Sequence, residues 1–324
     1  MIQLKKLFNF VVFLPGLFFA FALSGCVNGS DDVFVSKNKI ILGEQYPNVH
    51  FDQEVMIVRI SQMLIIGQLS KNERADLYFE RGVLYDSLGL WGLARYDFTQ
   101  ALALQPRSPA IYNYLGLYLL LDEDYDSALE AFNAVLELDP NYDYTYLNRG
   151  LDFYYMERYN LAQQDLLKFY EAKKDDPYRA LWLYINELKF KPNEATQNLA
   201  RRAKDLSTEY WGTYIVQYYL NEISVKDLLD KAKVFVDPQS SQYAEILTET
   251  YFYLAKQKLN AGHAEEAETL FKLAMANQVY NFVEYRFALF ELAKLKTNSE
   301  QTEQAVVQRV KTTQAPNSKE LDAE

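Results

Sequence analysis

The chain has 324 residues, of which 49% are hydrophobic but only 12 are glycine and 9 are proline, and this composition favours a helical globular protein with a large core. Its 44 acidic and 33 basic residues give a formal net charge of −11. A protein this acidic lacks the electrostatic attraction to a phosphate backbone that nucleic-acid binding requires, so a nucleic-acid partner is disfavoured.

The first 25 residues are typical of an export signal. Lys5 and Lys6 precede an apolar run over residues 7–22, which is too short and too weakly flanked to be a stable transmembrane span. Residues 1–25 are therefore expected to be cleaved off as a signal peptide.

Cys26 is the only cysteine and directly follows Leu23-Ser24-Gly25. This arrangement resembles the lipobox of bacterial lipoproteins, in which diacylglycerol is attached to the thiol and the signal peptide is cut before it. The resemblance implies a lipid anchor at Cys26, and Val27, in place of an aspartate, favours the inner leaflet of the outer membrane, facing the periplasm. The alternative is a lone buried or incidental cysteine.

Two segments precede the regular part of the chain. Residues 26–50 are expected to form an extended tether between the lipid and the folded body. Residues 51–69 predict a helix that is apolar on more than one face, with Phe51, Val55 and Val58 on one stripe and Ile57, Ile60 and Leu64 on another. This helix either only caps the first repeat or also contributes a homodimer contact.

A period of 34 residues runs through residues 70–177. Glycines recur at 82, 116 and 150, and alanines follow each of them by 12 residues at 94, 128 and 162. The pattern resembles the tetratricopeptide repeat (TPR), in which each unit is a pair of antiparallel helices. The column glycines are predicted to let the two helices approach closely, Ser70 to cap the first helix, and Gly89 to adopt the left-handed conformation where that helix ends.

The rest of the chain extends this array. Residues 178–247 read as irregular helical pairs, and residues 248–296 as a C-terminal TPR-like repeat with a closing helix, in which Ala255 takes the place of the column glycine. The polar residues 297–324 are expected to be disordered. The predicted fold class is thus all-α, a TPR helical solenoid with irregular helical pairs in the middle.

The first helix of each repeat is expected to face a concave groove. The positions predicted to line this groove are Phe79, Val83, Asp86, Asn113, Leu117, Leu120, Leu147, Leu151 and Tyr154. Their mostly apolar and aromatic character predicts that a hydrophobic peptide segment or a partner helix binds there. The alternative for each residue is a contact with the neighbouring repeat.

The sequence contains no recognisable motif for catalysis, metal binding or phosphate binding. His50 and His263 are far apart in sequence and have no ligand partners at metal spacing, and the chain has no glycine-rich phosphate loop and no nucleophile elbow. The sequence therefore predicts no catalytic residue, no metal and no cofactor, and a protein that is not an enzyme.

Several stretches resemble one family in the residues between the repeat columns as well. ERGVLYDSLGL, ALEAFNAVLELDPNYDY and LFKLAMANQVYNFVEYR are similar to the NlpI family of bacterial lipoproteins, and the resemblance covers residues 54–295. It implies a dimeric outer-membrane adaptor that binds peptidoglycan endopeptidases, brings one of them to a periplasmic tail-specific protease, and influences cell division. The tether and the C-terminal tail are longer here than in the family. A pilotin-like lipoprotein for pilus or outer-membrane-protein assembly is the alternative.

Overall fold

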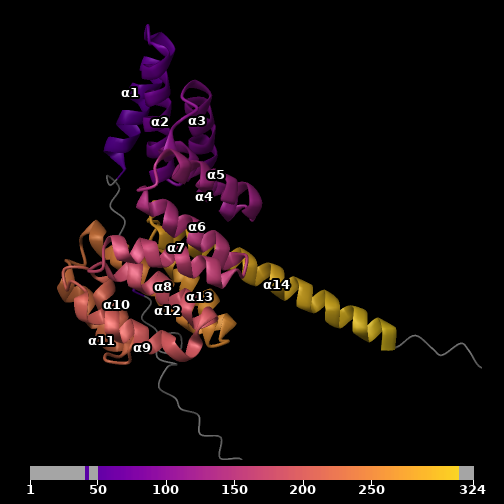
Figure 1. Ribbon diagram of the computed structural model, residues 1–324. Helices are drawn as coiled ribbons and strands as arrows, with labels where there is room; N and C mark the ends of the chain where they lie inside the picture. The colour runs from indigo at the N-terminus through magenta and orange to yellow at the C-terminus, as the bar shows by residue number, and fades with distance from the viewer. Residues whose placement is uncertain (1–40, 44–49, 314–324) are drawn as a thin grey trace, which may run out of the picture. The chain divides into compact units, whose positions relative to one another are not determined.

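The computed structural model describes residues 41–43 and 50–313, with side chains as far as residue 301. This part of the chain contains fourteen α-helices, one short 3-10 helix and no strand (Figure 1). The α-helices are α1 (Phe51–Ile66), α2 (Lys71–Ser87), α3 (Trp91–Leu104), α4 (Pro109–Leu121), α5 (Tyr125–Leu138), α6 (Asp143–Tyr155), α7 (Tyr159–Ala172), α8 (Pro177–Phe190), α9 (Pro192–Arg202), α10 (Gly212–Tyr219), α11 (Val225–Phe235), α12 (Ser241–Asn260), α13 (Ala264–Ala276) and α14 (Val283–Thr313). The predicted all-α fold is confirmed, whereas Cys26 lies outside the described residues.

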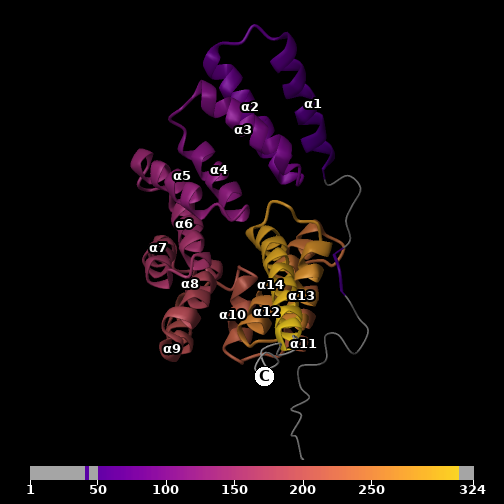
Figure 2. The ribbon, with the colours of Figure 1, turned by 90° about the vertical axis from the view of Figure 1, so that its right-hand side faces the viewer.

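Consecutive helices pack in pairs, as the TPR pattern predicts. The most extensive contacts join α2 to α3, α4 to α5, α6 to α7 and α12 to α13, and Figure 2 shows the first of these pairs side by side. Between α7 and α12, helices α8 to α11 pack with less regularity, since α10 contacts α8, α11 and α12. The protein therefore has a TPR helical fold in which irregular helices separate the repeats.

The column glycines are packing residues, as predicted. A Cβ added at Gly82 would lie 2.7 Å from a ring atom of Phe98, and one at Gly116 would lie 2.7 Å from the ring of Phe132. Real Cβ atoms do not approach other atoms so closely, so only glycine lets the second helix of each repeat lie against the first at this distance.

The predicted helix start and turn are confirmed. The Ser70 hydroxyl accepts a hydrogen bond from the Glu73 amide at 3.3 Å, and the Glu73 carboxylate accepts one from the Ser70 amide at 2.8 Å. Gly89 has φ of +73°, in the left-handed region. The same turn recurs 34 and 68 residues later at Glu123 and Glu157, with φ of 63° and 59°. The backbone therefore repeats where the glycine does not.

The expectation that residues 297–324 are disordered is wrong for residues 297–313, because α14 continues to Thr313. Residues 297–313 contain neither glycine nor proline, and seven of the 17 are glutamine, glutamate, lysine or arginine, which favour helix. A polar composition by itself therefore does not indicate the absence of helical structure. Residues 314–324 lie outside the described part of the chain.

Candidate protein-binding surface

The nine residues predicted to line a groove fall into two groups. Phe79, Val83, Asn113, Leu117 and Tyr154 are partly buried. Asp86, Leu120, Leu147 and Leu151 are buried, with at most 4% of each residue exposed. The prediction that these four contact a ligand is therefore wrong: the protein itself covers them, which is the neighbour-contact alternative that the sequence left open.

Asp86 is covered because helix α14 supplies its partner. The Asp86 carboxylate forms an ion pair with Arg286 and accepts a hydrogen bond from the Tyr118 hydroxyl at 2.5 Å. Both members of the ion pair are buried, with 6% and 4% of their side chains exposed. The position that a ligand would occupy in an open array is thus filled by a residue 200 positions away in the sequence.

Helix α14 also contacts the ends of the next two first helices. Lys294 forms an ion pair with Glu123 in the turn after α4, at 3.2 Å. At the end of α6, the ring of Tyr155 stacks on Phe287 with centroids 5.6 Å apart, and its hydroxyl donates a hydrogen bond to Glu291 at 2.9 Å. Side chains of α14 therefore contact residues at or just after the C-terminal ends of α2, α4 and α6.

Two further predicted positions have polar or aromatic neighbours within the chain. The Asn113 side-chain oxygen accepts hydrogen bonds from Thr145 at 3.0 Å and from Asn148 at 3.1 Å, both in the next repeat. The Lys256 ammonium lies 5.0 Å from the ring centroid of Tyr154. These contacts within the chain leave less of the Asn113 and Tyr154 side chains accessible to a partner protein.

The remaining apolar part of the predicted groove consists of Phe79, Val83 and Leu117, and each of them is partly exposed. The ring of Phe79 packs on the rings of Phe98 and Tyr114, with centroids 5.8 and 6.2 Å apart, so the repeat core holds Phe79 in place. These three residues on α2 and α4 are called the A-helix patch from here on.

A second apolar surface lies on α1. Ile60 and Leu64, from one predicted stripe, are buried, whereas Phe51, Val58 and Ile65 are 60%, 57% and 81% exposed. These three lie seven residues apart, which places them on one side of the helix. They are called the α1 face. Met56, Met63 and Ile66 are further exposed residues of this helix.

An ion pair that is not among the predicted features recurs inside the units. Arg81 donates two hydrogen bonds to Asp97, at 2.7 and 2.8 Å, and Arg149 makes the same pair of contacts with Asp165 at 2.7 and 2.9 Å. Each arginine directly precedes a column glycine, and each aspartate lies 16 residues after its arginine. The 34-residue comparison could have identified this pair from its spacing alone.

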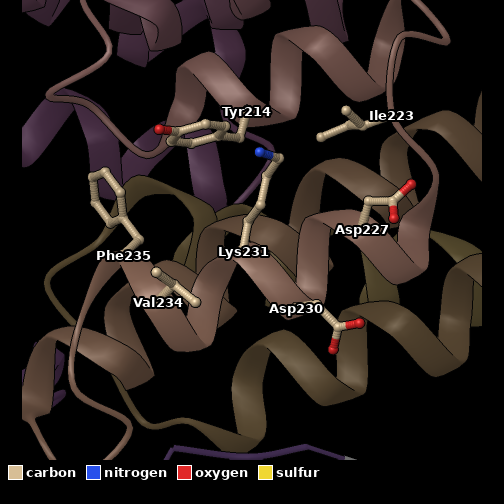
Figure 3. Close-up of a pocket in the computed structure, with 7 residues that line it drawn as sticks. All are labelled: Tyr214, Ile223, Asp227, Asp230, Lys231, Val234 and Phe235. Carbon is tan, nitrogen blue, oxygen red and sulfur yellow. The ribbon is translucent and has the colours of Figure 1, made fainter.

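Outside the repeats, an open hollow of about 720 Å³ lies beside α10 and α11, lined by Tyr214, Ile223, Asp227, Asp230, Lys231, Val234 and Phe235 (Figure 3). The Lys231 ammonium lies 5.2 Å from the centroid of the Tyr214 ring. Asp230 pairs with Lys226 and Lys233, whose hydrogen bonds lower its pKa to about 2. Its carboxylate is thus held ionised by neighbouring lysines, the opposite of what a general acid needs.

Neither a membrane span nor a metal site is found in the described part of the chain. No helix there combines the length and the apolar character that crossing a bilayer requires. Among residues 41–43 and 50–313, no group of histidine, cysteine, aspartate or glutamate side chains is arranged to hold a metal ion.

Comparison with known proteins identifies the family. A sequence profile of the tetratricopeptide repeat matches residues 109–142. Among solved structures, a tetratricopeptide repeat protein from Parabacteroides merdae matches 76% of this chain and 99% of its own, at 17% identity and a TM-score of 0.44. The type IV pilus biogenesis factor PilW matches 74% of this chain and 91% of its own, at 18% identity and a TM-score of 0.43. The chain is 66% identical over 302 residues to the lipoprotein NlpI homolog of Haemophilus influenzae, covering 92% of this chain and 96% of that protein. The chain therefore belongs to the NlpI family of TPR lipoproteins.

Proposed function

We propose that this protein is a non-enzymatic adaptor of the cell envelope, which binds peptidoglycan endopeptidases and a periplasmic tail-specific protease and so regulates cell-wall hydrolysis and cell division. Membership of the NlpI family, at 66% identity over nearly the whole chain, is the observation that carries the proposal. The repeat fold supports it, because stacked helical repeats present extended surfaces for other proteins.

The anchor and its location are part of the proposal. Lipidation of Cys26 would hold the protein in the inner leaflet of the outer membrane, with the helices in the periplasm. Acyl chains provide such attachment without any membrane-spanning helix.

The proposed mechanism is tethering. Two proteins bound to one scaffold meet at an effective concentration that is commonly millimolar for short links, so a weak encounter between protease and substrate becomes efficient without any chemistry by the scaffold. The A-helix patch is the proposed site for the endopeptidase, since it is the apolar part of the predicted groove that α14 leaves partly exposed.

We also propose a homodimer that uses the α1 face. Three large apolar side chains on one side of a helix, each more than half exposed, are unfavourable in water unless another surface covers them. A second copy of the same helix offers a complementary apolar surface, and a two-fold contact of this kind closes on itself.

The test measures how fast a purified peptidoglycan endopeptidase is degraded by the tail-specific protease, with and without this protein. At submicromolar concentrations the wild type is expected to raise the rate by more than about tenfold, while this protein alone releases no product from peptidoglycan. The Val83→Glu/Leu117→Glu variant is expected to lose most of the acceleration. Leu93→Glu, on the exposed surface of α3, is the control.

An unchanged degradation rate in the presence of wild-type protein would contradict the adaptor role. Acceleration that survives in the Val83→Glu/Leu117→Glu variant, with helicity retained by circular dichroism, would instead place the endopeptidase elsewhere. Crosslinking in cells followed by mass spectrometry distinguishes the alternative, because pilus or outer-membrane assembly proteins would then be recovered in place of hydrolases.

A further inference from the structure

A short extended segment, residues 41–43, lies against the C-terminal helices although it precedes α1 in the chain. It appears as the short indigo piece next to α13 in Figure 2. The Gly43 amide donates a hydrogen bond to the side-chain oxygen of Asn277 at 3.0 Å, and the Ile41 carbonyl accepts one from the Tyr251 hydroxyl at 2.5 Å. Both ends of the segment are thus held through their backbone.

The two side chains that hold the segment are buried and come from different elements. Tyr251 belongs to α12 and Asn277 directly follows α13, and both residues are 0% exposed. The amide of the Asn277 side chain donates to the Leu273 carbonyl at 3.2 Å, which fixes the direction in which its oxygen points. Each of these hydrogen bonds between a buried side chain and the segment stabilises the docked position.

Gly43 is required at this place for a separate reason. A Cβ added there would lie 2.5 Å from both Cα and Cβ of Ala244, and 2.8 Å from its amide nitrogen. Backbone atoms of a helix cannot move aside, so any other residue would push the segment away from α12. By contrast, the side chain of Leu42, between the two held ends, is 43% exposed.

We infer that residues 41–43 form a clip that fastens the N-terminal tether to the C-terminal helices α12 and α13. The clip itself does not depend on the proposed lipid anchor at Cys26, whereas its effect on the distance to the membrane rests on that anchor. About 15 residues separate the anchor from the clip, which allows a span of at most roughly 50 Å. Without the clip, about 25 residues separate the anchor from α1, and the limit rises to roughly 85 Å.

The clip therefore limits how far the folded body can lie from the anchor. The C-terminal helices, and not α1, become the point at which the tether joins the body. A partner that engages the repeats would then meet a scaffold held close to the membrane through α12 and α13, and release of the clip would lengthen its reach.

Hydrogen exchange of the full-length lipidated protein in detergent micelles tests the clip. The peptide that contains residues 41–43 is expected to exchange at least tenfold more slowly in the wild type than in Gly43→Val, while the α12 peptides stay equally protected in both. Leu42→Ser is the matched control and should behave like the wild type. Tyr251→Phe, which keeps the ring and removes one hydrogen bond, should give an intermediate rate. Equal exchange of this peptide in the wild type and Gly43→Val would overturn the clip.

A second measurement tests the consequence. A dye attached to Glu265→Cys on α13, which is exposed, reports energy transfer to acceptor lipids in vesicles of phosphatidylethanolamine and phosphatidylglycerol. Transfer is expected to fall in Gly43→Val and to stay unchanged in Leu42→Ser; equal transfer in the wild type and Gly43→Val would overturn the shortened reach. Failure of the wild type to bind vesicles would contradict the proposed anchor, while the exchange result would still decide the clip.

Discussion

Asp86 occupies a position at which an open TPR array contacts its ligand, yet its carboxylate is used inside the protein. It pairs with Arg286 on α14 and accepts a hydrogen bond from Tyr118, and all three residues are buried. A buried ion pair adds little net stability compared with apolar residues, but removal of one partner leaves a charge without compensation. The residue is therefore structural, and its replacement has a predictable cost.

Asp86→Ala is expected to lower the free energy of unfolding by about 3–5 kcal/mol, since Arg286 would remain charged and buried without its partner. Urea unfolding followed by circular dichroism measures the change. The control is Lys272→Ala, because Lys272 pairs with Glu268 at the surface, where the two side chains are 63% and 48% exposed. Its effect should stay below about 1 kcal/mol, and equal effects of the two variants would contradict the structural role of Asp86.

Asp152 is a second buried carboxylate, but it has no such partner. Both of its carboxylate oxygens are buried, and none of the described residues donates a hydrogen bond to them. Burial raises the pKa of Asp152 from its usual 3.8 to about 7, with a smaller contribution from the negative charge of Asp126 and an opposing one from Arg158. The folded protein therefore holds a proton on Asp152 more tightly than the unfolded chain does.

This raised pKa predicts how stability depends on pH. Between about pH 4 and pH 7 the folded state binds more protons at Asp152 than the unfolded state, so the contribution of this residue to the free energy of unfolding falls as the pH rises through this range. Asp152→Asn should flatten that part of the profile. It should stabilise the protein by about 1–3 kcal/mol at pH 8 and by less at pH 5, as measured by urea unfolding at both pH values. A stabilisation of the same size at pH 5 and pH 8 would show that the charge is not responsible.

Among the helical repeats, some recurring structural features produce a period in the sequence and others do not. Glycine recurs at 82, 116 and 150 because the second helix of each unit packs on it, as the short Cβ distances show. The left-handed turn recurs at 89, 123 and 157 as well, but only the first of these is glycine. The packing requirement therefore restricts the residue type more strictly than the turn does, since a left-handed residue with a Cβ costs only about 1–2 kcal/mol.

Two glycine substitutions should have opposite effects on stability. Gly116→Ala places a Cβ 2.7 Å from the Phe132 ring and is expected to lower the free energy of unfolding by about 1–3 kcal/mol. Gly92→Ala, in α3, meets nothing within 4 Å and should raise it by roughly 0.5 kcal/mol, because alanine loses less backbone freedom on folding. Thermal unfolding of the two variants compares them directly, and a loss of stability in both would contradict the distinction between packing and open positions.

At the scale of the whole described chain, two helices outside the first three repeats decide which surfaces are open. α14 engages the ends of α2, α4 and α6 through Arg286, Lys294 and Phe287. α1 buries Ile60 and Leu64 and leaves the α1 face in solvent. The surface left to partners is thus smaller on the repeats than their own sequence indicates, and larger on α1.

The proposed dimer makes a specific prediction for α1. Val58→Asp/Ile65→Asp places two charges in the centre of the α1 face and is expected to convert a dimer into a monomer, as measured by size-exclusion chromatography with light scattering. Both side chains are more than half exposed, so the helix content by circular dichroism should not change. Tyr96→Asp on α3, where Tyr96 is 57% exposed, serves as the control and should remain dimeric. A wild type that elutes as a monomer, or a double variant that stays dimeric, would contradict the proposal.

The candidate site was predictable only in part. Phe79, Val83 and Leu117 are apolar and partly exposed, as the repeat geometry predicts for a groove. Leu120 and Leu151 are equally apolar but are 0% exposed. A repeat pattern assigns all of these residues to the same side of their helices, and it contains no information on what another segment of the chain will place over them.

The paired repeats, the packing glycines and the first helix cap could be predicted from the sequence, because each of these depends on residues within about one repeat length of one another. The pairing of Asp86 with Arg286 and the docking of Gly43 against Ala244 and Asn277 are seen only in the folded chain. Those partners are about 200 residues apart and follow no period. Contacts of this kind are selected by how the C-terminal helices pack against the rest of the chain, and that packing depends on many side chains at once.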